Sequence, residues 1–226
     1  NYSIFEAVYG KELSIEYTNS LLDFTKMQKY LKRNLTVGEI GCSISHIKIY
    51  EDMINNNIEK ALILQDDISF DNNLFEIINN IDKLDLNWDI ILLGHHTYFS
   101  RDIDTKTSFW SKKYKLSNLY NIVRPSELGY GTYGYLISKN GAKKLLNELA
   151  QFYKPIDHYT GNDIYTNLYV ITPTIIKIND YLSENHNSME DRNNLKKSKT
   201  LYFTIKKVIK DIIRFILKFK FLKVYN

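Results

Sequence analysis

The chain has 226 residues, of which 44% are hydrophobic and 25% charged, a balance that is typical of globular proteins and excludes an intrinsically disordered chain. Its single cysteine, Cys42, excludes a disulfide within the chain and favours a reducing compartment. The formal net charge is +4, but residues 196–226 carry ten basic side chains against one acid, a charge of +9, which leaves −5 for residues 1–195. We therefore expect a mildly acidic body with a strongly basic tail.

Predicted strands and helices alternate in the first half of the chain. Residues 2–9 predict a strand, and residues 21–31 predict a short amphipathic helix. Thr36 with Glu39 three residues later forms a capping-box pattern, which predicts a longer helix up to about Asn56. A buried strand, a helix and a second buried strand follow, over residues 61–65, 75–81 and 88–94. This order indicates an α/β fold.

The second half begins with a polar and aromatic segment, residues 98–124, which we interpret as an insertion over the site with short β-like stretches. The next predicted elements are a glycine-rich loop that runs into a strand, a helix and the start of another, over residues 129–138, 139–150 and 155–158. Residues 170–178 predict a last strand, which Pro173 interrupts and so places near a sheet edge.

The strand predicted over residues 61–65 ends in two adjacent acids, Asp66 and Asp67. Open α/β sheets place their chemistry at the carboxyl ends of the strands. Adjacent carboxylates repel each other unless a cation or a proton offsets them, so the pattern favours a hard divalent metal that in turn holds phosphate. A solvated acidic turn after a strand is the alternative that this pattern alone leaves open.

Four segments together resemble glycosyltransferase family 25, the lipooligosaccharide galactosyltransferases of Gram-negative bacteria and their relatives. They are residues 35–46, 61–67, 88–94 and 134–146, and the resemblance extends over roughly residues 5–190. It implies a GT-A fold with a Rossmann-like mixed sheet, a UDP-sugar donor, Mn(II) or Mg(II), and inversion at the anomeric carbon. The chain starts near the family's Ala-Val-x-Gly segment (residues 7–10), so we expect the family's first strand to be missing from the sheet.

The resemblance also assigns residues to the site. Asp67 is the expected direct metal ligand, with Asp66 beside it serving the metal and the nucleotide, and Gln65 stands where the family has Glu, which removes one negative charge. Further residues are expected at the nucleotide and sugar side (His46, Gly134, Tyr135) and as a late metal ligand (His186). A packed histidine, a tight turn with core packing, and a solvated loop histidine are the respective alternatives.

An inverting transferase needs a base to take the proton of the acceptor hydroxyl. The resemblance favours Asp157, with Asp163 and Glu127 as rivals and a helix N-cap as the alternative for Asp157. His95 and His96 could line the pocket, but further ligands for a zinc site are not suitably placed.

The basic tail has apolar and basic residues on opposite faces of a predicted helix over residues 201–224. It carries too many charges to span a bilayer, so an anionic membrane surface is the favoured partner. Docking on the body and DNA binding are alternatives, and we expect no nucleic acid because the aromatic residues lie on the apolar face.

These inferences predict a glycosyltransferase domain over residues 1–195 and a membrane-associating tail over residues 196–226. The expected reaction is transfer of a hexose, most simply galactose, from a UDP-sugar to a lipid-linked lipooligosaccharide core sugar at the cytoplasmic face of the bacterial inner membrane. A metal-dependent phosphohydrolase or nuclease, and a non-catalytic membrane-docked nucleotide-sugar binder, are the alternatives.

Overall fold

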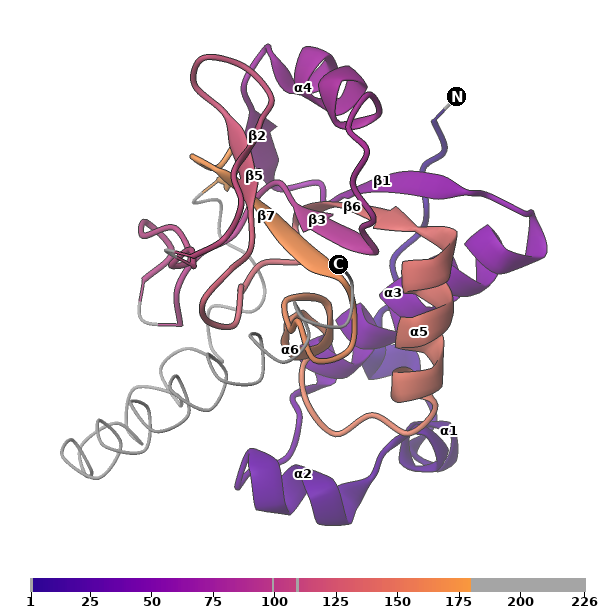
Figure 1. Ribbon diagram of the computed structural model, residues 1–226. Helices are drawn as coiled ribbons and strands as arrows, with labels where there is room; N and C mark the ends of the chain where they lie inside the picture. Colours follow the sequence, from indigo (N-terminus) through magenta and orange to yellow (C-terminus); the bar gives the residue numbers. More distant parts are fainter. Residues whose placement is uncertain (1, 99, 109, 180–226) are drawn as a thin grey trace, which may run out of the picture. The chain divides into compact units, whose positions relative to one another are not determined.

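The computed structural model describes residues 2–98, 100–108 and 110–179, which belong to one compact unit (Figure 1). Its helical elements are η1 (Gly10–Glu12), α1 (Ile15–Leu21), α2 (Phe24–Tyr30), α3 (Val37–Asn55), α4 (Leu74–Ile81), α5 (Lys139–Leu149) and α6 (Asp157–Thr160). Its strands are β1 (Lys60–Leu64), β2 (Ile68–Phe70), β3 (Ile90–Leu92), β4 (Tyr114–Lys115), β5 (Asn121–Val123), β6 (Gly134–Ser138), β7 (Leu168–Thr172) and β8 (Ile176–Ile178).

The main sheet is mixed and has six strands in the order β1-β6-β3-β7-β5-β4. β6 runs antiparallel to both β1 and β3, and β3 runs parallel to β7. The carboxyl ends of β1, β3 and β7 therefore meet at one edge of the sheet, which is where α/β proteins place their ligands. β2 and β8 form a separate two-stranded sheet.

Both faces of the central strands are buried, which explains why they are apolar throughout. In β3, Ile90 and Leu92 pack into a core that includes α3 and α5, whereas Ile91 and the following Leu93 pack into a second core that includes α4. Figure 1 shows α3 and α5 on one side of the sheet and α4 on the other. The result is a three-layer α/β/α arrangement.

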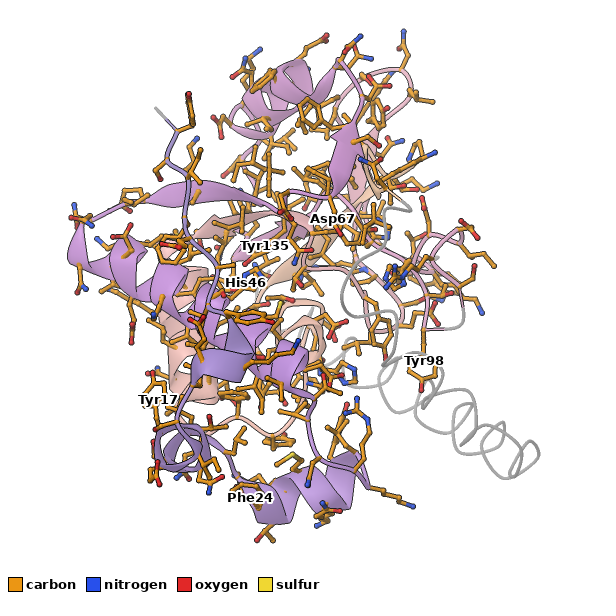
Figure 2. The ribbon with its side chains drawn as sticks, turned by 180° about the vertical axis from the view of Figure 1, so that it is seen from behind. Tyr17, Phe24, His46, Asp67, Tyr98 and Tyr135 are labelled. Carbon is orange, nitrogen blue, oxygen red and sulfur yellow. The ribbon has the colours of Figure 1, made fainter. Side chains whose placement is uncertain are left out.

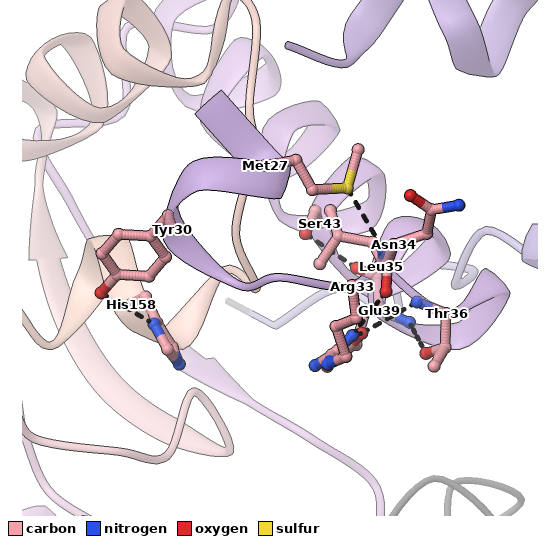
Figure 3. Close-up of polar contacts among 9 residues, drawn as sticks. All are labelled: Met27, Tyr30, Arg33, Asn34, Leu35, Thr36, Glu39, Ser43 and His158. Atoms are coloured by element: carbon pink, nitrogen blue, oxygen red, sulfur yellow. Dashed lines mark hydrogen bonds and ion pairs between the residues drawn. The ribbon is translucent and has the colours of Figure 1, made fainter. Parts of the chain in front are cut away.

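The start of α3 is fixed as the sequence predicts. Thr36 Oγ1 accepts a hydrogen bond from the Glu39 backbone N at 3.2 Å, and Glu39 Oε2 accepts one from the Thr36 N at 2.9 Å. Arg33 donates two hydrogen bonds, of 2.7 and 2.8 Å, to the Glu39 carboxylate (Figure 3). The capping box thus forms together with an ion pair that the sequence did not reveal.

The α/β fold and most elements are confirmed, but the strand predicted over residues 2–9 is wrong. Residues 2–9 form no strand, and the first helical element is η1. The helix predicted over residues 21–31 is present as α2, but it begins at Phe24: α1 ends at Leu21, and the side chain of Asp23 caps α2 by accepting a hydrogen bond from Lys26 N at 2.8 Å. The N-cap residue thus sets the point at which this amphipathic helix begins.

The last predicted strand is also two elements. Pro173 separates β7 from β8, and β7 lies inside the sheet between β3 and β5, not near an edge. β8 leaves the main sheet and pairs with β2, a strand that the sequence analysis missed because it is only three residues long and largely exposed. The segment interpreted as an insertion supplies β4 and β5 to the main sheet.

The basic tail and His186 lie outside the described residues. Among the helices that the structure does describe, none is long and apolar enough to cross a membrane.

Candidate active site

The acidic pair lies where β1 ends, at the edge shared with β3 and β7 (Figure 2). Gln65 N donates to Tyr133 O at 3.0 Å, and beyond the pair Asp67 O accepts from Asn179 N at 2.7 Å. Backbone hydrogen bonds therefore fix the chain on both sides of Asp66.

Asp67 carries an unsatisfied oxygen at this position. It is half-buried, and its Oδ1 is buried without a hydrogen-bond partner among the described residues. Burial raises the pKa of Asp67, the neighbouring Asp66 raises it further, and the charge of Arg101 lowers it. A buried carboxylate oxygen without a partner is costly, so this oxygen is suited to a cation.

The donor set fits a hard divalent metal that shares its ligands with a substrate. Mg²⁺ in phosphate-handling sites is bound by one or two carboxylates together with phosphate oxygens and water. Asp67 supplies a buried carboxylate oxygen and Asp66 is exposed beside it. No group of three or more acidic, histidine or cysteine ligands occurs within residues 2–179 as described, so phosphate and water would supply the remaining ligands.

His46 and Tyr135 are brought together, but in the core beneath the site (Figure 2). Tyr135 Oη lies 2.7 Å from His46 Nδ1 and 2.7 Å from Tyr50 Oη, and all three side chains are buried. Burial lowers the pKa of His46 to about 4, so the imidazole is neutral at pH 7. These contacts join α3 to β6 and give no direct support to nucleotide binding by His46 or Tyr135, which stays a prediction.

The glycines of this region make room for one aromatic ring. A Cβ atom at Gly94 or at Gly131 would lie 2.2 or 2.4 Å from the ring of Tyr133, and Gly131 has a positive φ of 119°. Gly134 is instead constrained by Ile176, whose side chain a Cβ would meet at 2.6 Å. The role of Gly134 in the structure is therefore packing of β6 against β8, and its part in sugar binding stays a prediction.

His95 and His96 differ in their roles. His95 Nε2 donates to Ile171 O at 2.7 Å while its Nδ1 accepts from Thr105 N at 3.1 Å, so both ring nitrogens hold the loop after β3. His96 is half-buried and stacks on Tyr133 with ring centroids 6.2 Å apart and planes 5° apart. His96 thus contributes a ring face to the site, whereas His95 is structural.

A pocket of about 610 Å³ opens beside Tyr133. Its lining includes Arg101 and Asp104, but neither Asp66 nor Asp67. The Asp104 carboxylate accepts from Thr174 N and Oγ1, both at 3.0 Å, and so holds the loop to the end of β7. Arg101 is exposed and close enough to Asp67 to lower its pKa, which places one cation beside the acidic pair.

Asp157 is the first residue of α6 and is half-buried. The N-cap alternative is wrong, because Ile156 occupies the N-cap position. Burial raises the pKa of Cys42, on α3, to about 12, and the carboxylates of Asp157, Glu39 and Asp67 add to that rise. The expected base and the expected metal ligand therefore both lie near Cys42 in the first turns of α3.

The two alternatives to Asp157 as the base are Glu127 and Asp163. Glu127 Oε1 accepts from Lys106 N at 3.2 Å and so holds two loops together. Asp163 lies in the turn after α6 and is half-buried. Asp157 remains the candidate base, because its carboxylate acts on His96, Tyr130 and Cys42, whereas the carboxylate of Glu127 acts on Tyr130.

Three side chains around the acidic pair and Asp157 were not predicted from the sequence: Arg101, Tyr98 and Tyr130. Tyr98 and Arg101 lie at the start of the segment interpreted as an insertion, residues 98–124, and Tyr130 lies in the glycine-rich loop that follows it. The signal that could have found them is their closeness in sequence to the carboxyl end of β3 and to the glycine-rich loop before β6, since loops at that edge carry function.

A mixed sheet covered on both faces, with an acidic pair at the carboxyl end of a strand, is consistent with a GT-A-like glycosyltransferase. The sequence model of "Glycosyltransferase family 25 (LPS biosynthesis protein)" matches residues 1–160. The chain belongs to glycosyltransferase family 25.

Proteins similar to this chain are named as galactosyltransferases or as members of the same family. The chain is 31% identical to human procollagen galactosyltransferase 2 over 150 residues, which are 63% of this chain and 22% of the relative. It is 32% identical over 168 residues to a "Glycosyltransferase 25 family member" of Aedes aegypti, covering 71% of this chain and 25% of the relative. The chain thus spans about a quarter of the length of these curated relatives.

Proposed function

We propose that this protein is a hexosyltransferase that transfers galactose from a UDP-sugar to a hydroxyl group of a glycan, with inversion of configuration. The observation that carries the proposal is the unpartnered Asp67 Oδ1 beside Asp66 at the carboxyl end of β1, in a chain that belongs to family 25. The galactosyltransferase names of the relatives support the choice of sugar.

On the donor side, Asp66 and Asp67 would hold a divalent metal, which when bound stabilises negative charge on the departing diphosphate. Arg101, whose positive charge acts on Asp67, is placed to bind a phosphate oxygen of the same donor. Gln65 can donate a hydrogen bond to the nucleotide but adds no negative charge.

On the acceptor side, Asp157 takes the proton of the attacking hydroxyl as the new bond to the anomeric carbon forms and the bond to the diphosphate breaks. A carboxylate on the opposite side of the sugar from the leaving group is what a single inverting displacement requires. Glu127 and Asp163 are the alternative bases.

The acceptor that we propose is a sugar of a lipid-linked oligosaccharide, and the site of action is the cytoplasmic face of the bacterial inner membrane. The description of the family as an LPS biosynthesis protein supports this acceptor. The basic amphipathic pattern of residues 201–226 supports attachment to an anionic surface, which would raise the local concentration of a lipid-anchored acceptor. The names of the relatives make procollagen the competing acceptor.

The proposal predicts that substitution of Asp67 and substitution of Asp157 reduce different activities. A screen of UDP-sugars, read by UDP release with Mn²⁺ and with EDTA, identifies the donor used by the full chain. Asp67→Asn should lower both donor hydrolysis and transfer by at least about 100-fold, because it removes the charge that the metal and diphosphate need. Asp157→Asn should lower transfer by a similar factor while donor binding is retained.

The exposed Asp85 provides the matched control, since Asp85→Asn removes an equal charge on the loop before β3. Undiminished transfer by Asp67→Asn would rule out the metal-site assignment. UDP-sugar turnover by wild type that never requires a sugar acceptor would instead favour the phosphohydrolase alternative, and binding of UDP-sugar without any turnover would favour the non-catalytic binder.

A further inference from the structure

Five aromatic side chains from four separate segments form a continuous row beside the candidate base. The row runs from His96 and Tyr98 after β3, through Tyr130 before β6, to His158 on α6 and Tyr30 on α2. The ring centroids of Tyr130 lie 6.1 Å from His96, 5.5 Å from Tyr98 and 5.2 Å from His158. Tyr30 Oη closes the row with a contact of 3.3 Å to His158 Nδ1 (Figure 3).

The row is partly exposed to water. Tyr98 is 53% exposed and Tyr30 49% exposed, while the members between them are half-buried. Figure 2 shows Tyr98 at the outer surface of the molecule. Exposed aromatic side chains that cluster, instead of being scattered singly, are typical of ligand-binding surfaces.

The backbone holds the row in place. His96 N donates to Tyr130 O at 2.8 Å and Tyr130 N donates to His96 O at 3.1 Å. Gly129 N donates to Gly161 O at 2.9 Å, and a Cβ at Gly161 would lie 1.6 Å from Gly129 O, so the loop that carries Tyr130 lies directly on the end of α6. A surface that is fixed before the ligand arrives loses little entropy when it binds.

Asp157 is adjacent in sequence to His158 and acts electrostatically on the same rings. Burial raises the pKa of Tyr130, and the Asp157 carboxylate raises it further. Burial lowers the pKa of His96, and Asp157 opposes that shift. The Asp157 carboxylate is therefore close enough to the row to act on two of its rings.

We propose that the aromatic row is the acceptor-sugar site, in which a hexopyranose packs its C–H face on Tyr98 and Tyr130 and turns a hydroxyl toward Asp157. A hexopyranose has a face of C–H groups and a rim of hydroxyls, so it matches an amphipathic aromatic surface with an acid at its side. The inference rests on the proposed transferase function and adds to it the residues that hold the acceptor sugar.

The test uses saturation-transfer difference NMR on the full chain with lactose, methyl galactoside and methyl glucoside as probes. With wild type we expect saturation transfer to the C–H protons of the sugar ring. The saturation-transfer signal should be about tenfold weaker with Tyr98→Ala and with Tyr130→Ala. Tyr98→Trp should retain it, because a larger ring keeps the packing face. Tyr17→Ala is the matched control, since Tyr17 is 45% exposed on α1 and lies outside the row (Figure 2).

The same variants separate this inference from the proposed function. The acceptor KM for transfer should rise about tenfold in Tyr98→Ala, while the Tyr17→Ala control should keep both the wild-type KM and the wild-type rate of acceptor-free donor hydrolysis. The acceptor site would be overturned if none of the three sugars received saturation, or if a procollagen-derived peptide received it and the sugars did not. Either result would count even if donor hydrolysis persists. Failure of wild type to turn over any UDP-sugar, with sugar binding intact, would count against the transferase and leave the sugar site standing.

Discussion

Gln65 is the residue at which this chain departs from the acidic triplet of the family that it resembles. The backbone N of Gln65 is tied to Tyr133 O, and its half-buried side chain comes directly before the acidic pair. An amide in place of a carboxylate removes one unit of negative charge from the surroundings of a metal, and metal affinity depends on that charge count.

Gln65→Glu should therefore lower the Mn²⁺ concentration that gives half-maximal activity, by about tenfold. A metal titration of transfer activity checks this expectation, with Gln65→Asn as the control that changes the side chain without adding charge. An unchanged Mn²⁺ requirement would mean that residue 65 does not face the metal, and a lack of activity in both proteins would favour a binder.

α6 and the segments beside it are held by an unusual buried cation. Lys154 is 1% exposed, donates to Tyr165 Oη at 2.8 Å, and lies over four tyrosine rings. Its Nζ is 4.3 to 5.3 Å from the centroids of Tyr159, Tyr165, Tyr30 and Tyr153. This cluster joins α2 to the chain around α6, three residues before Asp157, through cation–π contacts.

Burial lowers the pKa of Lys154 from 10.5 to about 8. Between those two values the unfolded chain binds more protons than the folded chain, so this group makes the free energy of unfolding rise with pH from about 8 upward. Lys154→Met should remove this dependence on pH. The free energy of unfolding of the variant minus that of wild type should be largest at pH 7 and should fall by up to about 3 kcal/mol toward pH 10.

Urea unfolding of both proteins at pH values from 7 to 9.5 measures this difference. The exposed Lys143 on α5 gives the control, because Lys143→Met removes a lysine that is not enclosed and should unfold with the pH dependence of wild type. Parallel stability curves for wild type and Lys154→Met would show that the buried ammonium is not destabilised by its surroundings.

At the scale of the whole molecule, the charge distribution divides the chain. Residues 196–226 carry a net charge of +9 and the remainder carries −5. A basic segment with an apolar face binds anionic membranes through both electrostatic attraction and apolar burial. Binding by this route weakens with salt and with the loss of anionic lipid.

Removal of residues 201–226 should therefore release the protein from vesicles of mixed phosphatidylcholine and phosphatidylglycerol in a sedimentation assay, and should leave transfer to a soluble acceptor within about twofold of wild type. Vesicles of phosphatidylcholine alone serve as the control and should bind the full chain weakly. Sedimentation of the shortened protein with anionic vesicles would place the membrane contact elsewhere in the chain.

Local signals in the sequence were sufficient for several elements. The capping box of Thr36 and Glu39 starts α3, and the apolar run before Asp66 and Asp67 forms β1. Both depend on neighbours only a few residues away, which is why a single sequence reveals them. Asp23 is a further local signal of this kind, because it caps α2 and so starts that helix at Phe24 and not at Leu21.

The sequence by itself thus determined the α/β class, the strand end that carries the acidic pair, and the resemblance to family 25. Only the tertiary structure decided that β7 is a central strand, that His46 pairs with Tyr135 in the core, and that Tyr30 meets His158 across 128 residues of chain. The physical reason is that caps and apolar runs act over a few residues, whereas a site is made by contacts between segments far apart in the chain, whose pairing depends on how all the layers pack at once.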